Sequence, residues 1–275
     1  MKIGKATVPR TAICTSNEER IVVRGADLAE ELIGQVGFAD YFHLLVTGRR
    51  PDAAASAVLN ATLVAIAEHG FVPSVQAARM TLAAAPDAMQ SAVAAGLLGC
   101  GSVILGASES AGRLFLAIEK EAAAQHGGDL RAAARAVLTE LRARKQPIPG
   151  YGHPEHKQRD PRVDALFKVS KRAGGGQQYV ELAQWVEEVI PDVVGKDLRL
   201  NVSAAIPAVL LGVGFPVNAL KGVPMLARTA GLIAHLNEEL EDPVGFALSY
   251  QAVREQQYTG ALPGQGGGGV REASA

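Results

Sequence analysis

Cysteine and net charge are both scarce in this sequence. The only two cysteines, Cys14 and Cys100, lie far apart, and neither has a Cys or His partner at metal-ligand spacing. This argues against a disulfide scaffold or a zinc site and fits a reducing compartment. The formal net charge is -1, so no overall charge favours nucleic acid or an anionic membrane as a partner. Any anionic ligand must be held by cations placed locally.

Long apolar runs are missing as well. The most apolar stretches, around residues 94–107 and 204–214, are interrupted by Gly or Pro and are too short to cross a bilayer. The first residues, Met1 to Lys5, are not followed by an apolar core of signal-peptide length. We therefore expect a soluble, cytoplasmic protein that binds no metal and does not associate with membranes.

The spacing of apolar residues predicts an all-α chain with a short β-hairpin at its start. Residues 8–24 alternate weakly around Ser16-Asn17-Glu18-Glu19, which favours the hairpin. Beyond Gly25 the spacing is helical. We expect Gly48 to end one helix, and Pro51, Pro73 and Pro86 to lie in the first turns of others. The predicted helices cover residues 27–33, 38–48, 53–69, 93–107, 110–126, 129–145, 163–172, 179–189, 204–214 and 223–240.

Residues 1–262 are expected to form one compact domain, with a smaller subdomain at roughly 150–215. Four consecutive glycines, 266–269, make 263–275 a flexible tail. The chain has no internal repeat and no strand–helix alternation long enough for a doubly wound sheet. The glycines at 94–106 follow no predicted strand and lack the lysine of a phosphate loop, which argues against a nucleotide site there.

One loop gathers residues suited to chemistry. Pro149, Gly150 and Gly152 surround Tyr151, so the backbone is stiffened and can approach a ligand closely. His153 follows and can transfer a proton near neutral pH. Arg162, nine residues further on, could bind a carboxylate with two hydrogen bonds. The alternative is a surface loop with a solvated charge cluster, and spacing alone does not separate the two.

Arg228 is placed unusually, inside the otherwise apolar segment 223–233. A buried guanidinium is costly unless it is paired, and Glu238 and Glu239 are too far along the same helix to pair with it locally. Arg228 therefore either reaches water or a distant structural carboxylate, or it binds an anionic ligand.

The remaining histidines are weaker candidates. His69 lies near a predicted helix end, before Gly70, where a His is a common cap. His43 and His235 have apolar neighbours and suit the core or an interface, and His126 suits a helix end. None of these four alone predicts an enzyme.

Together these segments resemble the citrate synthase family. The run Gly150-Tyr151-Gly152-His153, followed by Lys157 and Asp160-Pro161-Arg162, is close to the family's most specific signature. Three further segments resemble family motifs in the same order: 22–28 with 42–48, then 68–70, then 226–235. The likeness covers roughly residues 10 to 260. Few residues separate Pro51 from His69, which is similar to the citrate synthase-like module of ATP-citrate lyase and to small bacterial citryl-CoA lyases.

The resemblance implies a citrate synthase-like helical fold, a homodimer and a CoA ester as substrate, with no permanently bound cofactor. It implies that a citrate- or oxaloacetate-like ligand binds His69, His153, Arg162 and Arg228. It also implies that the CoA ester contacts Pro149, Gly150, Tyr151, Gly152 and Lys157.

Two positions depart from the family. Its acetyl-CoA chemistry uses a His to polarise the thioester carbonyl and an Asp to move a proton, and ungapped alignment places Ile104 and Ser203 there. Ile cannot donate a hydrogen bond and an unassisted Ser is a poor base. Ordinary citrate synthesis is therefore not expected.

Three functions fit these matches and departures. The first is a carbon–carbon lyase acting on citryl-CoA or a similar 3-hydroxy-3-carboxyacyl-CoA, with His153 as base and Ser203 or glycine-loop N–H groups stabilising an oxyanion. Glu68, Glu109 and His156 are reserve proton carriers. The second is a condensing acyltransferase acting on another 2-oxo acid. The third is a non-catalytic CoA- and citrate-binding homologue.

Overall fold

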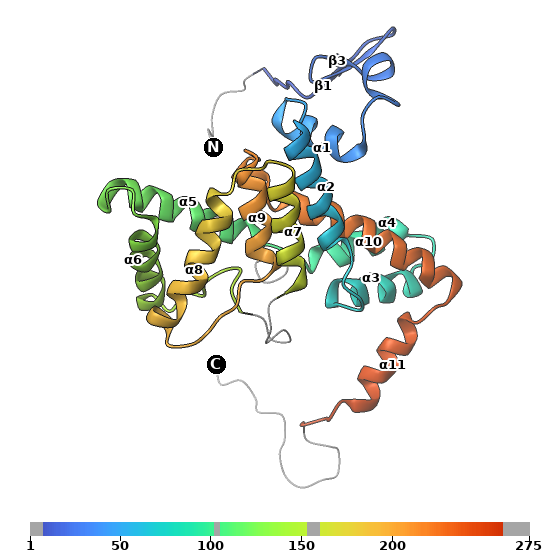
Figure 1. The fold of residues 1–275 in the computed structure, drawn as a ribbon. Coiled ribbons are helices and arrows are strands. Elements are labelled where there is room, and N and C mark those ends of the chain that lie inside the picture. The colour runs from blue at the N-terminus through green and yellow to red at the C-terminus, as the bar shows by residue number, and fades with distance from the viewer. Residues whose placement is uncertain (1–7, 102–104, 153–159, 261–275) are drawn as a thin grey trace.

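A computed structural model describes residues 8–101, 105–152 and 160–260. Its N-terminal part contains a small antiparallel sheet of β1 (Cys14–Ser16), β2 (Ile21–Val23) and β3 (Ala26–Asp27). The predicted hairpin is confirmed as β1 and β2, and β3 adds a third strand. Asn17 closes the turn because its side-chain oxygen accepts the N–H groups of Glu19 and Arg20. The sheet lies at one end of the molecule (Figure 1).

A short π-helix, Leu28–Leu32, leads from the sheet to α1 (Phe38–Thr47) and α2 (Ala53–Ala67). Gly48 ends α1 with a φ of 74°, as predicted, because only glycine adopts this conformation readily. Asp52 caps α2 by accepting the N–H of Ala55. Pro51 therefore lies one residue before the cap, and not in the first turn.

Two short helices follow, α3 (Pro73–Ala84) and α4 (Met89–Leu98). Pro73 opens α3 as predicted, whereas Pro86 lies before the α4 cap, Ala88. The predicted helix at 93–107 is wrong, since α4 ends at Leu98, which is 87% exposed, and the next helix begins at Ala107. Only one face of α4 packs against the protein. The apolar composition of this segment therefore does not mean that the helix is buried on all sides.

Most of the main hydrophobic core comes from five helices, which reach from the left edge to the middle of Figure 1: α5 (Ala107–Gln125), α6 (Leu130–Ala143), α7 (Pro161–Arg172), α8 (Gln178–Val194) and α9 (Val202–Gly212). Every residue from Ala204 to Leu210 is buried, which makes α9 the core helix of the set. It packs against α5, α7 and α8. The core thus surrounds the first turn of α9, and that turn is where the candidate site lies.

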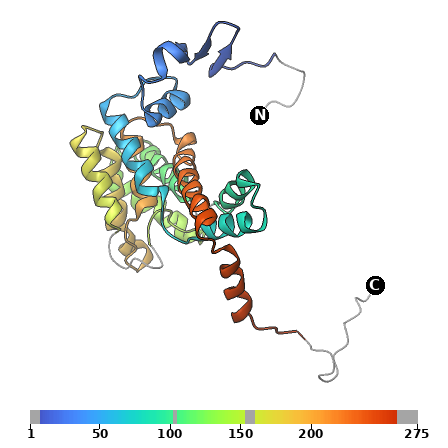
Figure 2. The ribbon, with the colours of Figure 1, turned by 90° about the vertical axis from the view of Figure 1, so that its right-hand side faces the viewer.

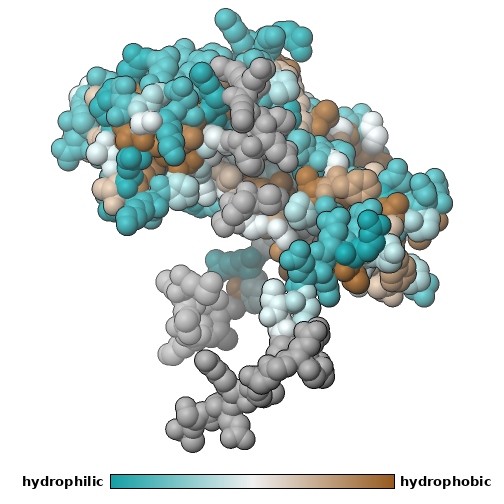
Figure 3. Space-filling view, turned by 90° about the horizontal axis from the view of Figure 1, so that it is seen from below, coloured by the Kyte–Doolittle hydropathy of each residue, from teal (hydrophilic) through white to brown (hydrophobic). Residues whose placement is uncertain are grey.

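After a 3₁₀ turn, Val217–Ala219, the long helix α10 (Gly222–Glu241) packs against α2, α3 and α4. The last helix, α11 (Gly245–Glu255), contacts α3 and extends away from the rest of the molecule (Figure 2). Seen from below, apolar side chains are scattered among polar ones (Figure 3). No helix in the described ranges is long and apolar enough to cross a membrane.

Arg79 anchors α3 to α10 from a fully buried position, 1% exposed. Its Nε lies 2.6 Å from a carboxylate oxygen of Glu239, and its Nη1 lies 2.5 Å from one of Glu238. Glu239 also accepts the N–H groups of Val244 and Gly245, where α11 begins. These charged groups compensate one another's burial, which a buried charge requires.

Candidate active site

A cavity of about 950 Å³ lies among α2, α5, α6, α9 and α10 and the loop before α7. Eight of the ten residues predicted from the sequence line it: His69, Pro149, Gly150, Tyr151, Gly152, Arg162, Ser203 and Arg228. The other two, His153 and Lys157, lie outside the described residues, as do Ile104 and His156. Residues far apart in the sequence are therefore brought to one cavity, and the roles assigned to them stay predictions.

Arg228 is the outstanding group in this cavity. The residue is 3% exposed, and its Nε and Nη1 atoms have no hydrogen-bond partner in the part of the chain that the structure describes. Glu238 and Glu239 of α10 pair with Arg79. Because buried donors are normally satisfied, the cavity offers Arg228 as a site for an anion.

Arg162, in contrast, already has a partner. Asp160 caps α7 and accepts two hydrogen bonds from the Arg162 guanidinium, at 3.0 and 2.8 Å. Burial raises the pKa of the Asp160 carboxyl, but the hydrogen bonds from Arg162 outweigh it, so this pKa lies below its usual value. Asp160 therefore already offsets most of the charge of Arg162 that a ligand would meet.

The glycine loop is held by the strand-like segment before α9. Gly152 N–H donates to Arg199 O, Asn201 N–H donates to Gly150 O, and Tyr151 faces Leu200. Gly150 has a φ of 85°, and a Cβ there would lie 2.5 Å from the Ala204 Cβ. Glycine is therefore needed because the loop packs directly on α9.

Tyr151 is fixed in the core by its hydroxyl, which donates to Ala183 O at 2.8 Å. Burial raises the pKa of Tyr151 well above its usual value. The hydroxyl is thus occupied by a protein carbonyl.

Ser203 lies in the first turn of α9, and the structure describes no hydrogen bond from its hydroxyl to another described residue. The nearby backbone donors are used: Ser203 N–H donates to Asn201 Oδ1, and Val202 N–H to Asp160 Oδ2. Gly152 N–H is also used, so the Ser203 hydroxyl stays available to a ligand in the cavity that Ser203 lines at this helix N-terminus.

Asn201 was not singled out from the sequence. Its side chain caps α9 through Ser203 N–H and donates to Gly152 O at 2.7 Å, which joins the loop to the helix. An Asn before an apolar helical run is an N-cap signal that could have identified the capping role.

Arg113, which also lines the cavity, was likewise not singled out from the sequence, and it pairs with Glu109 at 2.7 Å. Glu109, one of the three residues named as reserve proton carriers, is therefore engaged in an ion pair.

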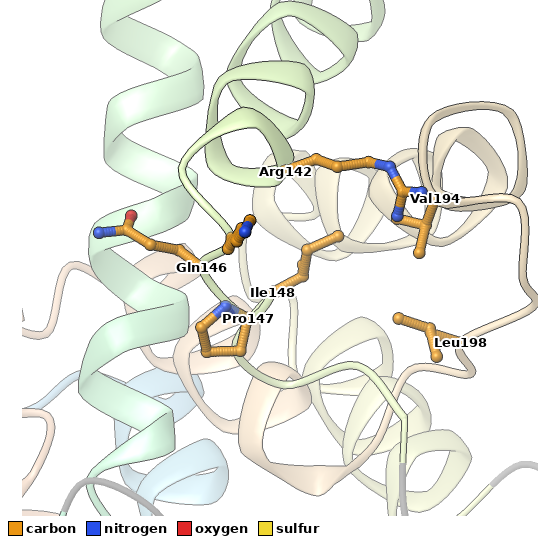
Figure 4. A pocket seen from close by; sticks show the side chains of 7 residues that line it. Arg142, Gln146, Pro147, Ile148, Val194 and Leu198 are labelled. Carbon is orange, nitrogen blue, oxygen red and sulfur yellow. The ribbon is translucent and has the colours of Figure 1, made fainter.

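A second cavity, of about 590 Å³, adjoins the first (Figure 4). Gln146 and Pro147 line both. Arg142 and Lys145 supply cations, and Ile148, Val194 and Leu198 supply an apolar wall. The two cavities thus share the segment that precedes the glycine loop.

The fold and the cavity define a helical protein whose cavity places a buried arginine, Arg228, beside a glycine loop. Residues 31–245 match the family model described as citrate synthase, C-terminal domain, so the chain belongs to the citrate synthase family. Among named relatives, the citrate synthase of Synechocystis sp. is 28% identical over 212 residues, which are 75% of this chain and 50% of that protein. A 2-methylcitrate synthase of Mycobacterium tuberculosis is 28% identical over 209 residues, 74% of this chain and 50% of that protein.

The chain therefore spans about half the length of these curated relatives. A solved structure matches it nearly end to end: citryl-CoA lyase from Hydrogenobacter thermophilus, with a TM-score of 0.82, 31% identity and coverage of 94% of this chain and 96% of that one. ATP citrate lyase from Methanothrix soehngenii, in complex with citrate and coenzyme A, matches with a TM-score of 0.70 and 25% identity, over 87% of this chain and 40% of that one.

Proposed function

We propose that this protein is a citryl-CoA lyase-like enzyme, which cleaves a 3-hydroxy-3-carboxyacyl-CoA into an acyl-CoA and a 2-oxo acid. The observation that carries the proposal is Arg228, a buried cation without a described partner in the cavity wall. A carboxylate of the substrate supplies what this guanidinium lacks. The end-to-end likeness to citryl-CoA lyase supports a lyase of this size.

The cleavage needs a base and an oxyanion donor. A base removes the proton of the tertiary hydroxyl, the oxygen forms a carbonyl, and the carbon–carbon bond breaks. The electron pair passes to the thioester enolate, which then takes a proton at carbon to give the acyl-CoA. His153 is the proposed base. Ser203 is the proposed donor to the enolate oxygen, because it lines the cavity at the N-terminus of α9 and its hydroxyl has no hydrogen-bond partner among the described residues.

The CoA part of the substrate is proposed to follow the glycine loop. Pro149, Gly150 and Gly152 line the large cavity, and Gln146 and Pro147 connect it to the second one, where Arg142 and Lys145 can attract phosphates. Replacing both cations with Ala should weaken CoA binding, most strongly at low salt. Unchanged CoA affinity would place the phosphates elsewhere.

A homodimer is also proposed. Phe246, Tyr250 and Val253 are 60–70% exposed on α11 and share one face at helical spacing. A second copy of the chain would cover this stripe. Sedimentation of the full chain and of Phe246→Ser tests it, and a wild-type monomer at micromolar concentration would rule it out.

The enzyme reading is tested by assaying both directions. Citryl-CoA is incubated with the protein and oxaloacetate is followed; separately, acetyl-CoA and oxaloacetate are incubated and free thiol is followed. We expect cleavage that falls about 100- to 1,000-fold in Ser203→Ala, is abolished in His153→Ala, and is unchanged in His126→Ala, at a helix end remote from the cavity lining.

Condensation is the second candidate, because the named relatives are citrate synthases and 2-methylcitrate synthases. Turnover only from acyl-CoA and a 2-oxo acid would favour it. No turnover, with citrate still raising the melting temperature, would favour a binding homologue. No turnover and no effect of citrate would refute the proposal.

A further inference from the structure

The turn that carries His69 into the cavity is held by a neighbouring carboxylate. The chain leaves α2 at Glu68, whose Oε1 accepts the N–H groups of His69 at 2.7 Å and Gly70 at 2.5 Å. Gly70 has a φ of 71°, so the backbone turns sharply at this point. The direction in which His69 enters the cavity therefore depends on where the Glu68 carboxylate is fixed.

That carboxylate is fixed by α10. His235 Nε2 lies 3.0 Å from Glu68 Oε1. His235 follows Arg228 by seven residues, two helical turns, so both lie on the same side of α10. Between them Gly231 touches the end of α2, since a Cβ there would clash with Ala67 O. One helix thus carries Arg228, which has no partner among the described residues, and the contact that holds the His69 turn.

The surroundings of His235 assign its proton. Nε2 lies 3.0 Å from Glu68 Oε1, and a carboxylate oxygen accepts, so Nε2 carries the hydrogen given to Glu68; Arg79 Nη1 lies 3.5 Å from Nδ1. Glu238 Oε2, on the same helix, is 3.9 Å from Nδ1, and the Phe71 ring lies against the imidazole at 5.8 Å. Arg79 has its own carboxylates in Glu238 and Glu239. Its anchoring of α3 therefore does not need His235.

We propose that His235 is a positioning residue for the tricarboxylate site: through Glu68 it sets the turn 68–70, and hence the distance between His69 and Arg228. The inference rests on the proposed function, in which both of these residues bind the tricarboxylate. It predicts a selective effect, because the CoA part of the cavity is built by the glycine loop and α6, which His235 does not touch. Loss of the contact should impair citrate binding and leave CoA binding intact.

The experiment compares four full-length variants by titration calorimetry, with citrate and CoA as separate ligands. His235→Leu should bind citrate about tenfold more weakly and CoA as wild type does. His235→Gln, whose amide can still donate to Glu68, should recover most of the citrate affinity. His126→Leu is the matched control: His126 also contacts a glutamate, Glu121, at 3.6 Å, but it lies at the far end of α5 and should change neither affinity. Glu68→Ala removes the acceptor while leaving α10 unaltered.

Equal citrate affinity in His235→Leu and wild type would overturn the inference, and so would an equal loss of citrate and CoA binding, which indicates a general structural role. If His235→Leu does not fold, Glu68→Ala decides: it must weaken citrate alone. The imidazole carbon-bound proton resonance of His69 should shift in both variants and not in His126→Leu. Failure of the proposed function is seen in the wild type itself, which would then not cleave citryl-CoA, whereas failure of this inference alone leaves wild-type cleavage and binding intact.

Discussion

Two buried arginines, Arg228 and Arg79, should respond in opposite ways to the same substitution. Both are at most 3% exposed, but Arg79 is paired with Glu238 and Glu239, whereas Nε and Nη1 of Arg228 have no partner among the described residues. Arg79→Leu leaves Glu239 buried without its cation and should lower the free energy of unfolding by about 3–5 kcal/mol. Arg228→Leu removes two unsatisfied donors, so without ligand it should leave stability unchanged or raise it by up to about 3 kcal/mol.

The ligand response of Arg228→Leu should be large. Truncating one partner of a buried charge pair costs about 2–5 kcal/mol of binding, which weakens citrate about 30- to 4,000-fold. At 100 times its dissociation constant, citrate adds about 2.7 kcal/mol to the stability of the wild type. With a 30-fold weaker site the same concentration adds less than about 1 kcal/mol.

The assay is thermal unfolding with and without citrate for wild type, Arg228→Leu and Arg79→Leu. We expect Arg228→Leu to melt at or above the wild-type temperature and to lose most of the citrate-induced increase. Arg79→Leu should melt lower and, if it still folds, should keep the citrate-induced increase. If Arg228→Leu were destabilised as much as Arg79→Leu, Arg228 would be a structural residue and the case for an anion site would fail.

Three further predictions concern the loop and its supports. Gly150→Ala should lower the free energy of unfolding by at least about 2 kcal/mol in urea titrations, because the left-handed φ and the contact with Ala204 disfavour any Cβ; a neutral result would mean that the loop does not pack on α9. Tyr151→Phe should cost about 1–3 kcal/mol by leaving Ala183 O unsatisfied, with citrate and CoA affinities unchanged; weaker CoA binding would show that the hydroxyl serves the ligand. The lowered pKa of Asp160 means that its contribution to stability is complete above the ordinary Asp pKa, near pH 4, and is lost as the pH falls further. Urea midpoints measured from pH 3 to 7 should therefore change less with pH in Asp160→Asn than in wild type, and parallel profiles would contradict this.

Local signals predicted much of the fold. Gly48 and Pro73 end and begin helices as expected, because the conformations they favour are properties of the residues themselves. The helix predicted at 93–107 failed because apolar composition indicates burial only when a partner surface exists, and most of α4 has none. The subdomain at 150–215 remains a prediction, and the glycine-rich tail lies outside the described residues.

The candidate site, like the fold, was predicted from the sequence only in part. Motif spacing was enough to name Gly150, Arg162 and Arg228, since the backbone freedom of a glycine and the charge of an arginine follow from the residue type alone. It left open whether Arg228 pairs with a distant carboxylate. The answer required the surroundings of Arg228 in the folded protein, where Nε and Nη1 have no partner among the described residues.

The sequence by itself determined most of the helices, the glycine loop and the identity of the cations. Only the tertiary structure decided which cation is satisfied and which turn His235 holds. Hydrogen bonds and charge compensation depend on distances across the packed interior, and neighbours along the chain do not determine those distances.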